Sequence, residues 1–304
     1  MDVHPNRVVA LFVLLAALWG TAFMAIKAGL ADLPPVLFAA VRYDIAGVCM
    51  LAVAAWRTEY LLPRTRADTA AIGVAALLMI AGYHTLLFIG EADPGVTSAA
   101  AAVIVSLAPL VTTALAAAVI PADGVDAVGA VAVAVGLVGV VVLVDPTAAT
   151  LAGGATVPKL LIVTAALSFA AGAVILRWLR APVPIETLEA WAMLAGAGVM
   201  HLVSVGRGER WVDAVWSPTA LAAVIYLAIF ASAVGFLIYF ALLREVGPVQ
   251  INLVSYVAPV FAAIAGWVAL GEVPTQTTAV GFAIIVAGFA LLKRRALVGL
   301  IPRG

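Results

Sequence analysis

Two oppositely charged side chains lie inside one apolar stretch of the sequence. Arg42 and Asp44 both fall near the middle of residues 34–55. An ionised group in hydrocarbon is costly, so each is a candidate for function. Residues two apart on a helix point in roughly opposite directions and cannot simply pair. We therefore expect at least one to meet another helix or a water-filled cavity. Arg42 would bond either to helix-end carbonyls or to a substrate.

A histidine lies deep in a second apolar stretch, residues 68–90. His84 follows Tyr83 there. An unperturbed imidazole titrates near pH ~6.5, so His84 could carry or relay a proton. The alternative is a neutral imidazole that is hydrogen-bonded to a neighbouring helix and serves packing alone.

Several polar side chains within the apolar stretch 248–270 share one helical face. Asn252, Ser255 and Tyr256 have helical spacing and precede Pro259. A proline can leave a nearby backbone carbonyl without its helical partner. Such a face either binds a neighbouring helix or lines a substrate path.

Similar features occur elsewhere in the chain. Ser106 lies beside Pro109, and Trp19 adds aromatic surface. At a rise of about 1.5 Å per residue, the polar groups bracket the middle of a membrane by roughly 5–10 Å. We predict the following substrate-binding residues: Trp19, Tyr83, His84, Ser106, Asn252, Ser255 and Tyr256.

Two further charges fall at the ends of apolar stretches. Lys27 lies near the end of residues 8–30, and Glu272 follows residues 248–270. They could pair across a gate, or each could simply reach water at the membrane surface. With Arg42 and Asp44, they are the predicted structural or gating charges.

The elements that position these residues must be membrane-spanning helices. Hydrophobic residues make up 65% of the 304 residues and charged residues only 11%. In soluble domains, hydrophobic residues make up about 45–50% and charged residues about 25%. The single cysteine, Cys49, excludes an internal disulfide, and the zero net charge gives no basic face for nucleic acid.

Ten stretches are long and apolar enough to cross a bilayer, which requires ~20 residues. Turn-forming residues separate several of them, including Leu33-Pro34-Pro35, Asp93-Pro94-Gly95 and Gly247-Pro248. The sequence therefore predicts an all-α integral membrane protein with crossings at residues 8–30, 34–55, 68–90, 96–119, 125–144, 159–180, 184–203, 218–243, 248–270 and 274–292.

The distribution of positive charges predicts the orientation. If the N-terminus is cytoplasmic, eleven Lys and Arg residues fall on the cytoplasmic side and four on the other side, with Arg42 inside a stretch. Positive charges concentrate in cytoplasmic loops. We therefore expect both termini in the cytoplasm and the chain in the cell membrane.

The two halves of the chain repeat each other. Gly129 and Gly136 match Gly281 and Gly288 with the same spacing of seven. Other matches at offsets near 150 include Pro109 with Pro259, Pro35 with Pro184 and Gly47 with Gly196. Two repeats of five crossings, residues 8–146 and 159–292, must be inverted relative to each other, as in many secondary transporters. Residues 293–304 would form a basic cytoplasmic tail.

Several short motifs resemble the EamA-type branch of the drug/metabolite transporter superfamily. They are residues 18–27 (LWGTAFMAIK), Val41-Arg42-Tyr43, Ala258-Pro259-Val260 and Leu270-Gly271-Glu272. The resemblance covers nearly the whole chain as two EamA-like units. It implies a ten-helix inner-membrane carrier, usually an exporter of amino acids, related metabolites or toxic compounds. The first unit lacks an acidic residue to match Glu272.

These observations predict a secondary carrier that exports a small amphipathic metabolite by alternating access, driven by the substrate gradient or by coupled protons. A membrane-embedded enzyme acting on lipid-linked substrates and a passive channel are the alternatives. The sequence contains no phosphate-binding loop, no metal-ligand cluster and no motif of a catalytic nucleophile. We expect no catalytic residue, metal or cofactor. The crossings at 125–144 and 274–292 hold almost nothing polar, which suggests the periphery or the contact of a homodimer; a monomer is equally compatible.

Overall fold

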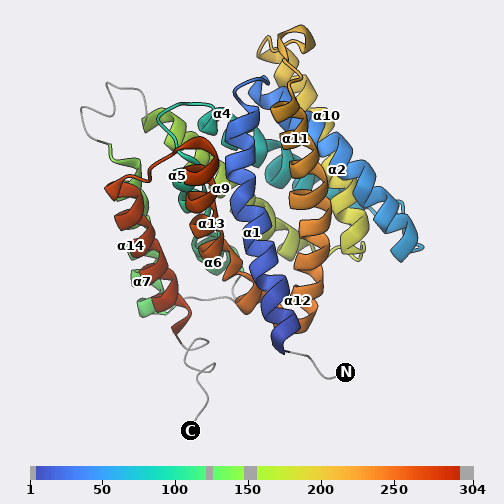
Figure 1. The fold of residues 1–304 in the computed structure, drawn as a ribbon. Helices are drawn as coiled ribbons and strands as arrows, with labels where there is room; N and C mark the ends of the chain where they lie inside the picture. The colour runs from blue at the N-terminus through green and yellow to red at the C-terminus, as the bar shows by residue number, and fades with distance from the viewer. Residues whose placement is uncertain (1–4, 121–125, 147–155, 295–304) are drawn as a thin grey trace.

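The chain forms a bundle of apolar helices in a computed structural model that describes residues 5–120, 126–146 and 156–294. These residues contain helices and turns and no strand. Helix α1 (Pro5–Gly29) begins, and helix α14 (Gln276–Leu292) ends, at the same end of the bundle (Figure 1). We call this end the terminal face and the other end the opposite face.

Ten apolar crossings are present among the described residues, as the sequence predicts. Five are single helices of 18 or more residues, and the shorter α13 and α14 are equally apolar. The single long helices are α1 (Pro5–Gly29), α2 (Pro35–Arg57), α7 (Ala127–Val144), α9 (Thr156–Leu179) and α10 (Ile185–Gly206). A single-turn 3₁₀ helix, η3 (Trp211–Asp213), follows α10 on the opposite face.

The third and eighth crossings share an unusual feature. The third consists of α3 (Arg66–Val74), the π-helical η1 (Ala75–Gly82) and α4 (Tyr83–Glu91). The eighth consists of α11 (Pro218–Ile225), the π-helical η4 (Tyr226–Val234) and α12 (Gly235–Ile251). Long π-helical segments are rare and concentrate at functional sites. They begin at residues 75 and 226, so the two halves repeat this feature at a spacing close to 150.

The fourth and ninth crossings also break at corresponding places, which corrects two predictions. Residues 96–119 form two helices, α5 (Ser98–Val105) and α6 (Ala108–Val119), because Pro109 cannot donate a hydrogen bond to Val105. The ninth crossing begins after Gly247, as predicted, but it is not one continuous helix, and its main part is α13 (Val254–Leu270). Gly247, with a left-handed φ of 81°, kinks the chain between the eighth and ninth crossings as predicted, and the ninth crossing breaks again at Asn252 and Leu253.

Contacts between the crossings follow an approximate two-fold symmetry. Helix α1 packs against α13, and α9 packs in the same way against α5 and α6. Helix α2 pairs with its counterpart α10, and α7 pairs with α14 (Figure 1). Because each repeat contains five crossings, the second repeat starts on the opposite face and runs inverted. The scaffold therefore consists of two related halves that meet across the bundle.

Glycines allow α7 and α14 to touch along their backbones. A Cβ atom at Gly139 would lie 2.8 Å from the carbonyl oxygen of Gly281, and one at Gly281 would lie 2.8 Å from the oxygen of Gly139. Small residues permit such close approach in membranes. The other faces of this pair expose large apolar residues such as Val131 and Val138. The pair lies at the periphery, one of the two places that the sequence suggested.

Adding a methyl group at this contact between glycines should destabilise the protein. We expect Gly139→Ala to lower the melting temperature by several degrees, because overpacking costs about 1–3 kcal/mol. Gly198→Ala in α10 is the matched control, since a Cβ there meets nothing within 4 Å and alanine favours a helix. Thermal unfolding in detergent measures both, and equal melting temperatures would refute the close contact.

Candidate functional site

A cavity of about 1040 Å³ lies between the two repeats. It reaches the terminal face, where its wall includes Asp126, Glu189 and Arg294. Towards the opposite face its wall ends at Ile26, Leu87 and Ala102. The cavity is therefore reached from the terminal face and sealed before the opposite face. Its volume is at the upper end of the range for small-molecule sites.

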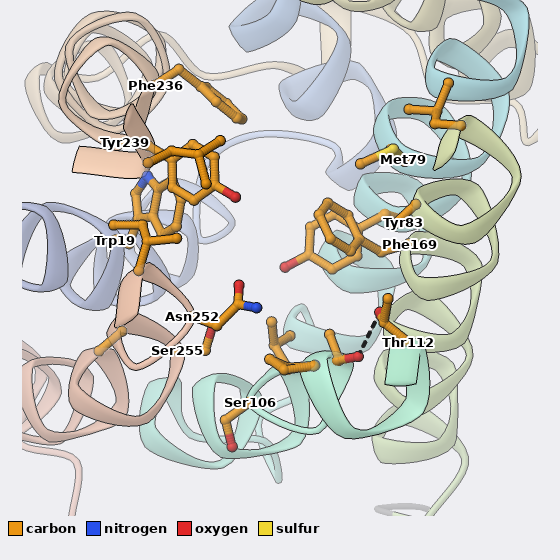
Figure 2. Close-up of a pocket in the computed structure, with 18 of the residues that line it drawn as sticks. Trp19, Met79, Tyr83, Ser106, Thr112, Phe169, Phe236, Tyr239, Asn252 and Ser255 are labelled. Carbon is orange, nitrogen blue, oxygen red and sulfur yellow. Dashed lines mark hydrogen bonds between the residues drawn. The ribbon is translucent and has the colours of Figure 1, made fainter. Parts of the chain in front are cut away.

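Aromatic side chains form two facing walls of the cavity. Trp19 packs against Phe236 and Tyr239, with ring centroids 6.0 and 5.5 Å away. Across the space, Tyr83 packs against Phe169 at 5.5 Å (Figure 2). The indole nitrogen of Trp19 donates to the carbonyl of Ala231 at 3.1 Å, within the π-helical η4. This bond fixes the orientation of the Trp19 ring in the wall.

Six of the seven predicted substrate-binding residues line this cavity: Trp19, Tyr83, His84, Ser106, Asn252 and Ser255. Asn252 belongs to the break before α13 and not to a helical face, and its amide points into the space between the aromatic walls (Figure 2). The hydroxyl of Ser106 donates to the carbonyl of Val103 at 2.6 Å. Breaks in the fourth and ninth crossings thus bring polar groups to the cavity from both repeats.

Tyr256 lies elsewhere, which corrects its predicted position. It does not belong to the cavity wall, and its ring packs on Phe289 of α14 with centroids 4.2 Å apart. The prediction assumed one continuous helix from residue 248, whereas the helix begins at Val254 and turns this side chain towards α14.

His84 is held by two hydrogen bonds. Its Nδ1 lies 3.0 Å from the carbonyl oxygen of Ile80, which can only accept, so Nδ1 carries a hydrogen. Its Nε2 lies 2.7 Å from the hydroxyl of Tyr43 and accepts from it in the neutral tautomer. The neutral imidazole is therefore fully hydrogen-bonded while one side of it borders the cavity.

Arg42 directs its positive charge to the cavity. Its Nε and Nη2 donate to the hydroxyl of Ser232 at 3.3 and 3.1 Å, and its guanidinium carbon lies 4.9 Å from the centre of the Tyr43 ring. The residue is 6% exposed. No carboxylate of a described residue forms an ion pair with it. The hydroxyl of Ser232 takes the place of the carbonyls that the sequence suggested, and other N–H groups of Arg42 remain for a ligand.

Asp44 points away from Arg42, as their spacing predicts. Its carboxylate lies 2.7 Å from Nε2 of His201 on α10. Both side chains are partly exposed on the outer side of α2 and α10. Asp44 therefore joins two helices and takes no part in the cavity.

The seal on the opposite face is made of helix-end contacts. The ammonium of Lys27 donates to the carbonyls of Glu91 and Asp93 at 2.9 and 2.6 Å, at the end of α4. Glu272 accepts from the backbone N–H of Ser98 at 2.9 Å, at the start of α5. Lys27 and Glu272 form no direct ion pair, contrary to one predicted alternative. Each charge instead stabilises the helix end whose partial charge it complements.

Two acidic residues of structural importance were missed in the sequence. Glu209 accepts from the backbone N–H groups of Val36 and Leu37 at 3.3 and 2.8 Å and so stabilises the start of α2. Glu91 is fully buried in the seal. Both lie at or beyond the ends of apolar stretches, where a carboxylate usually reaches water, so neither stands out in the sequence.

An ion pair lies at the entrance to the cavity on the terminal face. Arg294 donates to the carboxylate of Asp126 at 2.6 Å and so joins the end of α14 to the start of α7. Residues 295–304 of the predicted tail lie outside the described residues. Among the described residues, no three His, Cys, Asp or Glu side chains come together in a way that could hold a metal ion.

Comparison with known proteins decides the family. The family model described as the EamA-like transporter family matches residues 6–144 and 158–294. The chain belongs to the EamA-like transporter family. The two matches correspond to the two halves of the fold, and this multi-pass membrane protein is a transporter like its relatives.

The relatives cover nearly the whole chain. The "Uncharacterized inner membrane transporter YedA" of Escherichia coli K12 is 31% identical over 90% of this chain and 87% of its own length. The "Probable terminal-alkyne amino-acid exporter" of Streptantibioticus cattleyicolor is 26% identical over 96% and 95%. A solved structure titled "Crystal structure of protein" shares the fold, with a TM-score of 0.65, 23% identity and coverage of 96% and 98%.

The hydrogen bond between Tyr43 and His84 should stabilise this EamA-like fold. We expect Tyr43→Phe to lower the free energy of unfolding by about 1–3 kcal/mol, because it leaves a buried acceptor without a partner. Tyr239→Phe is the control, since the hydroxyl of Tyr239 makes no hydrogen bond to a described residue and its loss should change stability little. Unfolding in detergent measures the free energy of unfolding of both variants. An equal decrease in the two would argue against the hydrogen bond between Tyr43 and His84.

Proposed function

We propose that this chain is a secondary carrier that exports a small amphipathic metabolite by alternating access. The observation that carries the proposal is the cavity between the two repeats, which is reached from the terminal face and sealed at the opposite face. A carrier needs a central site that is reached from each side in turn. A channel would need a continuous passage, so the seal favours a carrier.

The lining of the cavity favours a substrate with an apolar body and an anionic group. The facing aromatic walls, which include Trp19 and Tyr83, suit an apolar side chain (Figure 2). Arg42 offers a guanidinium with which no described carboxylate forms an ion pair, and a guanidinium binds a carboxylate through paired hydrogen bonds. The name of the Streptantibioticus relative also fits an amino-acid-like substrate. Tyr256 is not included in the proposed site.

Transport would need no cofactor or nucleic acid and could use the substrate gradient or coupled protons. His84 is the proton-carrying candidate that the sequence suggested, although its two nitrogens already form hydrogen bonds. The acidic residues that the structure describes do not gather at one centre, and an enzyme acting on lipid-linked substrates would need such a cluster.

Exchange in proteoliposomes tests the carrier and its binding of carboxylates. We expect saturable counterflow of at least one of L-leucine, L-methionine and L-phenylalanine, with weak competition from the corresponding amino-acid amides. Arg42→Gln should raise the half-saturation concentration by about 10–100-fold, because a charge-assisted hydrogen bond contributes about 1.5–3 kcal/mol. Arg42→Lys should give an intermediate value.

Asp44→Asn is the control for a charge outside the cavity, and its half-saturation concentration should match that of the unmodified protein. Flux that rises linearly with concentration, without counterflow, would refute the carrier. Unchanged affinity in Arg42→Gln would refute the role of Arg42 alone.

The orientation is part of the proposal. The excess of Lys and Arg on the terminal face favours cytoplasmic termini, which would make the cavity accessible from the cytoplasm in this state. A fluorescent reporter that matures only in the cytoplasm should therefore fluoresce when it is fused after Gly304. A full-length fusion that stays dark would show the reverse orientation.

A further inference from the structure

Glu91 occupies an unusual position in the seal. It is the last residue of α4, its side chain is fully buried, and neither carboxyl oxygen has a hydrogen-bond partner among the described residues. Leu87, one helical turn earlier, lines the end of the cavity. Glu91 therefore lies one turn beyond the cavity, inside the layer that closes it.

The charged groups on neighbouring elements are bound elsewhere. Lys27 of α1 directs its ammonium to the backbone carbonyls of Glu91 and Asp93, and no ion pair within 4.0 Å joins it to the Glu91 carboxyl group. Glu272 accepts from the N–H of Ser98.

Two further cations lie on the helices packed against α4. Arg42 of α2 donates to Ser232 at the cavity. Lys159 of α9 donates to the carbonyl of Leu143 at the end of α7. No described cation is thus hydrogen-bonded to the carboxyl group of Glu91.

An ionised carboxylate without a donor carries a large desolvation cost, whereas a neutral carboxylic acid carries a much smaller one. Packing does not require an acid at this place. With the spacing of 151 that relates the two π-helical segments, Glu91 corresponds to Leu242, which is also fully buried. The second repeat thus buries a hydrocarbon side chain at the corresponding place, so the repeated helix packing alone does not explain the acid.

We propose that Glu91 is a proton-binding site and that the seal closes only when its carboxyl group carries a proton. When the seal opens, Lys27 leaves the carbonyls at the end of α4 and Glu91 reaches water on the opposite face, to which it releases the proton. Closing takes a proton up from that side. This inference rests on the alternating access proposed above and makes the proton a regulator of it, because Glu91 takes the proton up from the opposite face and releases it to the same face.

The effect of proton binding on the seal has a definite direction. Protons bind the closed form better, so acid on the opposite face shifts the carrier towards the state whose cavity opens to the terminal face. Glutamine at position 91 imitates the protonated acid and should hold the seal closed at every pH.

Cysteine labelling measures this equilibrium without transport. Ala102→Cys, in a Cys49→Ala background, places a thiol at the sealed end of the cavity, where Ala102 is 2% exposed. A membrane-impermeant maleimide is applied from the opposite face between pH 5.5 and 8.5. Rates are divided by those of Val273→Cys, an exposed loop position, which removes the pH dependence of the thiol reaction itself.

We expect the normalised rate to rise about fivefold or more with pH when Glu91 is present, and to stay low and flat in Glu91→Gln. Glu91→Leu, which copies Leu242, should behave in the same way and serves if glutamine impairs folding. Asp213→Asn is the matched control for a carboxylate on the same face outside the seal. The bond from Arg210 lowers the pKa of Asp213, so this group does not titrate in the range, and its variant should keep the full rise.

Two results would overturn the inference. One is a normalised labelling rate that rises with pH by the same factor when position 91 is glutamine or leucine. The other is a flat rate in the unmodified background together with normal counterflow, which would leave the carrier intact and remove only the proton site. A flat rate together with absent counterflow would instead refute alternating access, and the proton site with it.

Discussion

Hydrocarbon supplies no hydrogen-bond partners, so every charged side chain within the membrane must find its partner inside the protein. This constraint explains where the few charges of the chain lie. Lys27 and Glu272 bind the ends of helices, and Asp44 binds His201. Arg42 and Glu91 lack a charged partner within hydrogen-bond distance, because Arg42 has only a neutral hydroxyl partner and Glu91 has none among the described residues. These two incompletely satisfied groups carry our proposals for substrate and proton.

Duplication supplies the scaffold, and differences between the halves supply the chemistry. The π-helical segments, the broken crossings and the glycine contacts occur in both repeats. Arg42, in contrast, corresponds at the spacing of 149 to Trp191, which donates to the carbonyl of Leu61. Glu91 corresponds to Leu242. Inverted halves of this kind form many secondary transporters, whereas Arg42 and Glu91 belong to the first half alone.

The sequence predicted the parts of the fold that depend on composition and periodicity. The ten crossings follow from apolar length, and Gly129, Gly136, Gly281 and Gly288 indicated close helix packing without showing that α7 meets α14. Six cavity residues were recognised because polar groups are conspicuous in apolar stretches. The opposite directions of Arg42 and Asp44 followed from helical geometry.

The remaining features depend on tertiary contacts that periodicity does not encode. The direction of Tyr256 depends on where α13 begins, and the break at Asn252 is not marked by a proline or glycine at that residue. Ser232 is one hydroxyl in a long apolar run, and only the fold brings it to Arg42. Glu91 resembles an ordinary residue at the end of a helix until the neighbouring helices are seen to bury it.

Alternating access, as we propose it, requires the two repeats to exchange between a form open at the terminal face and a form open at the opposite face. Spin labels at Ala92 and Val273, in a Cys49→Ala background, lie on two exposed segments on either side of the seal. Pulsed electron–electron double resonance in lipid nanodiscs measures the distance between the two labels. Alternating access predicts two distance populations, one for the sealed form and a longer one for the open form. A single narrow distance at every pH and substrate concentration would contradict it.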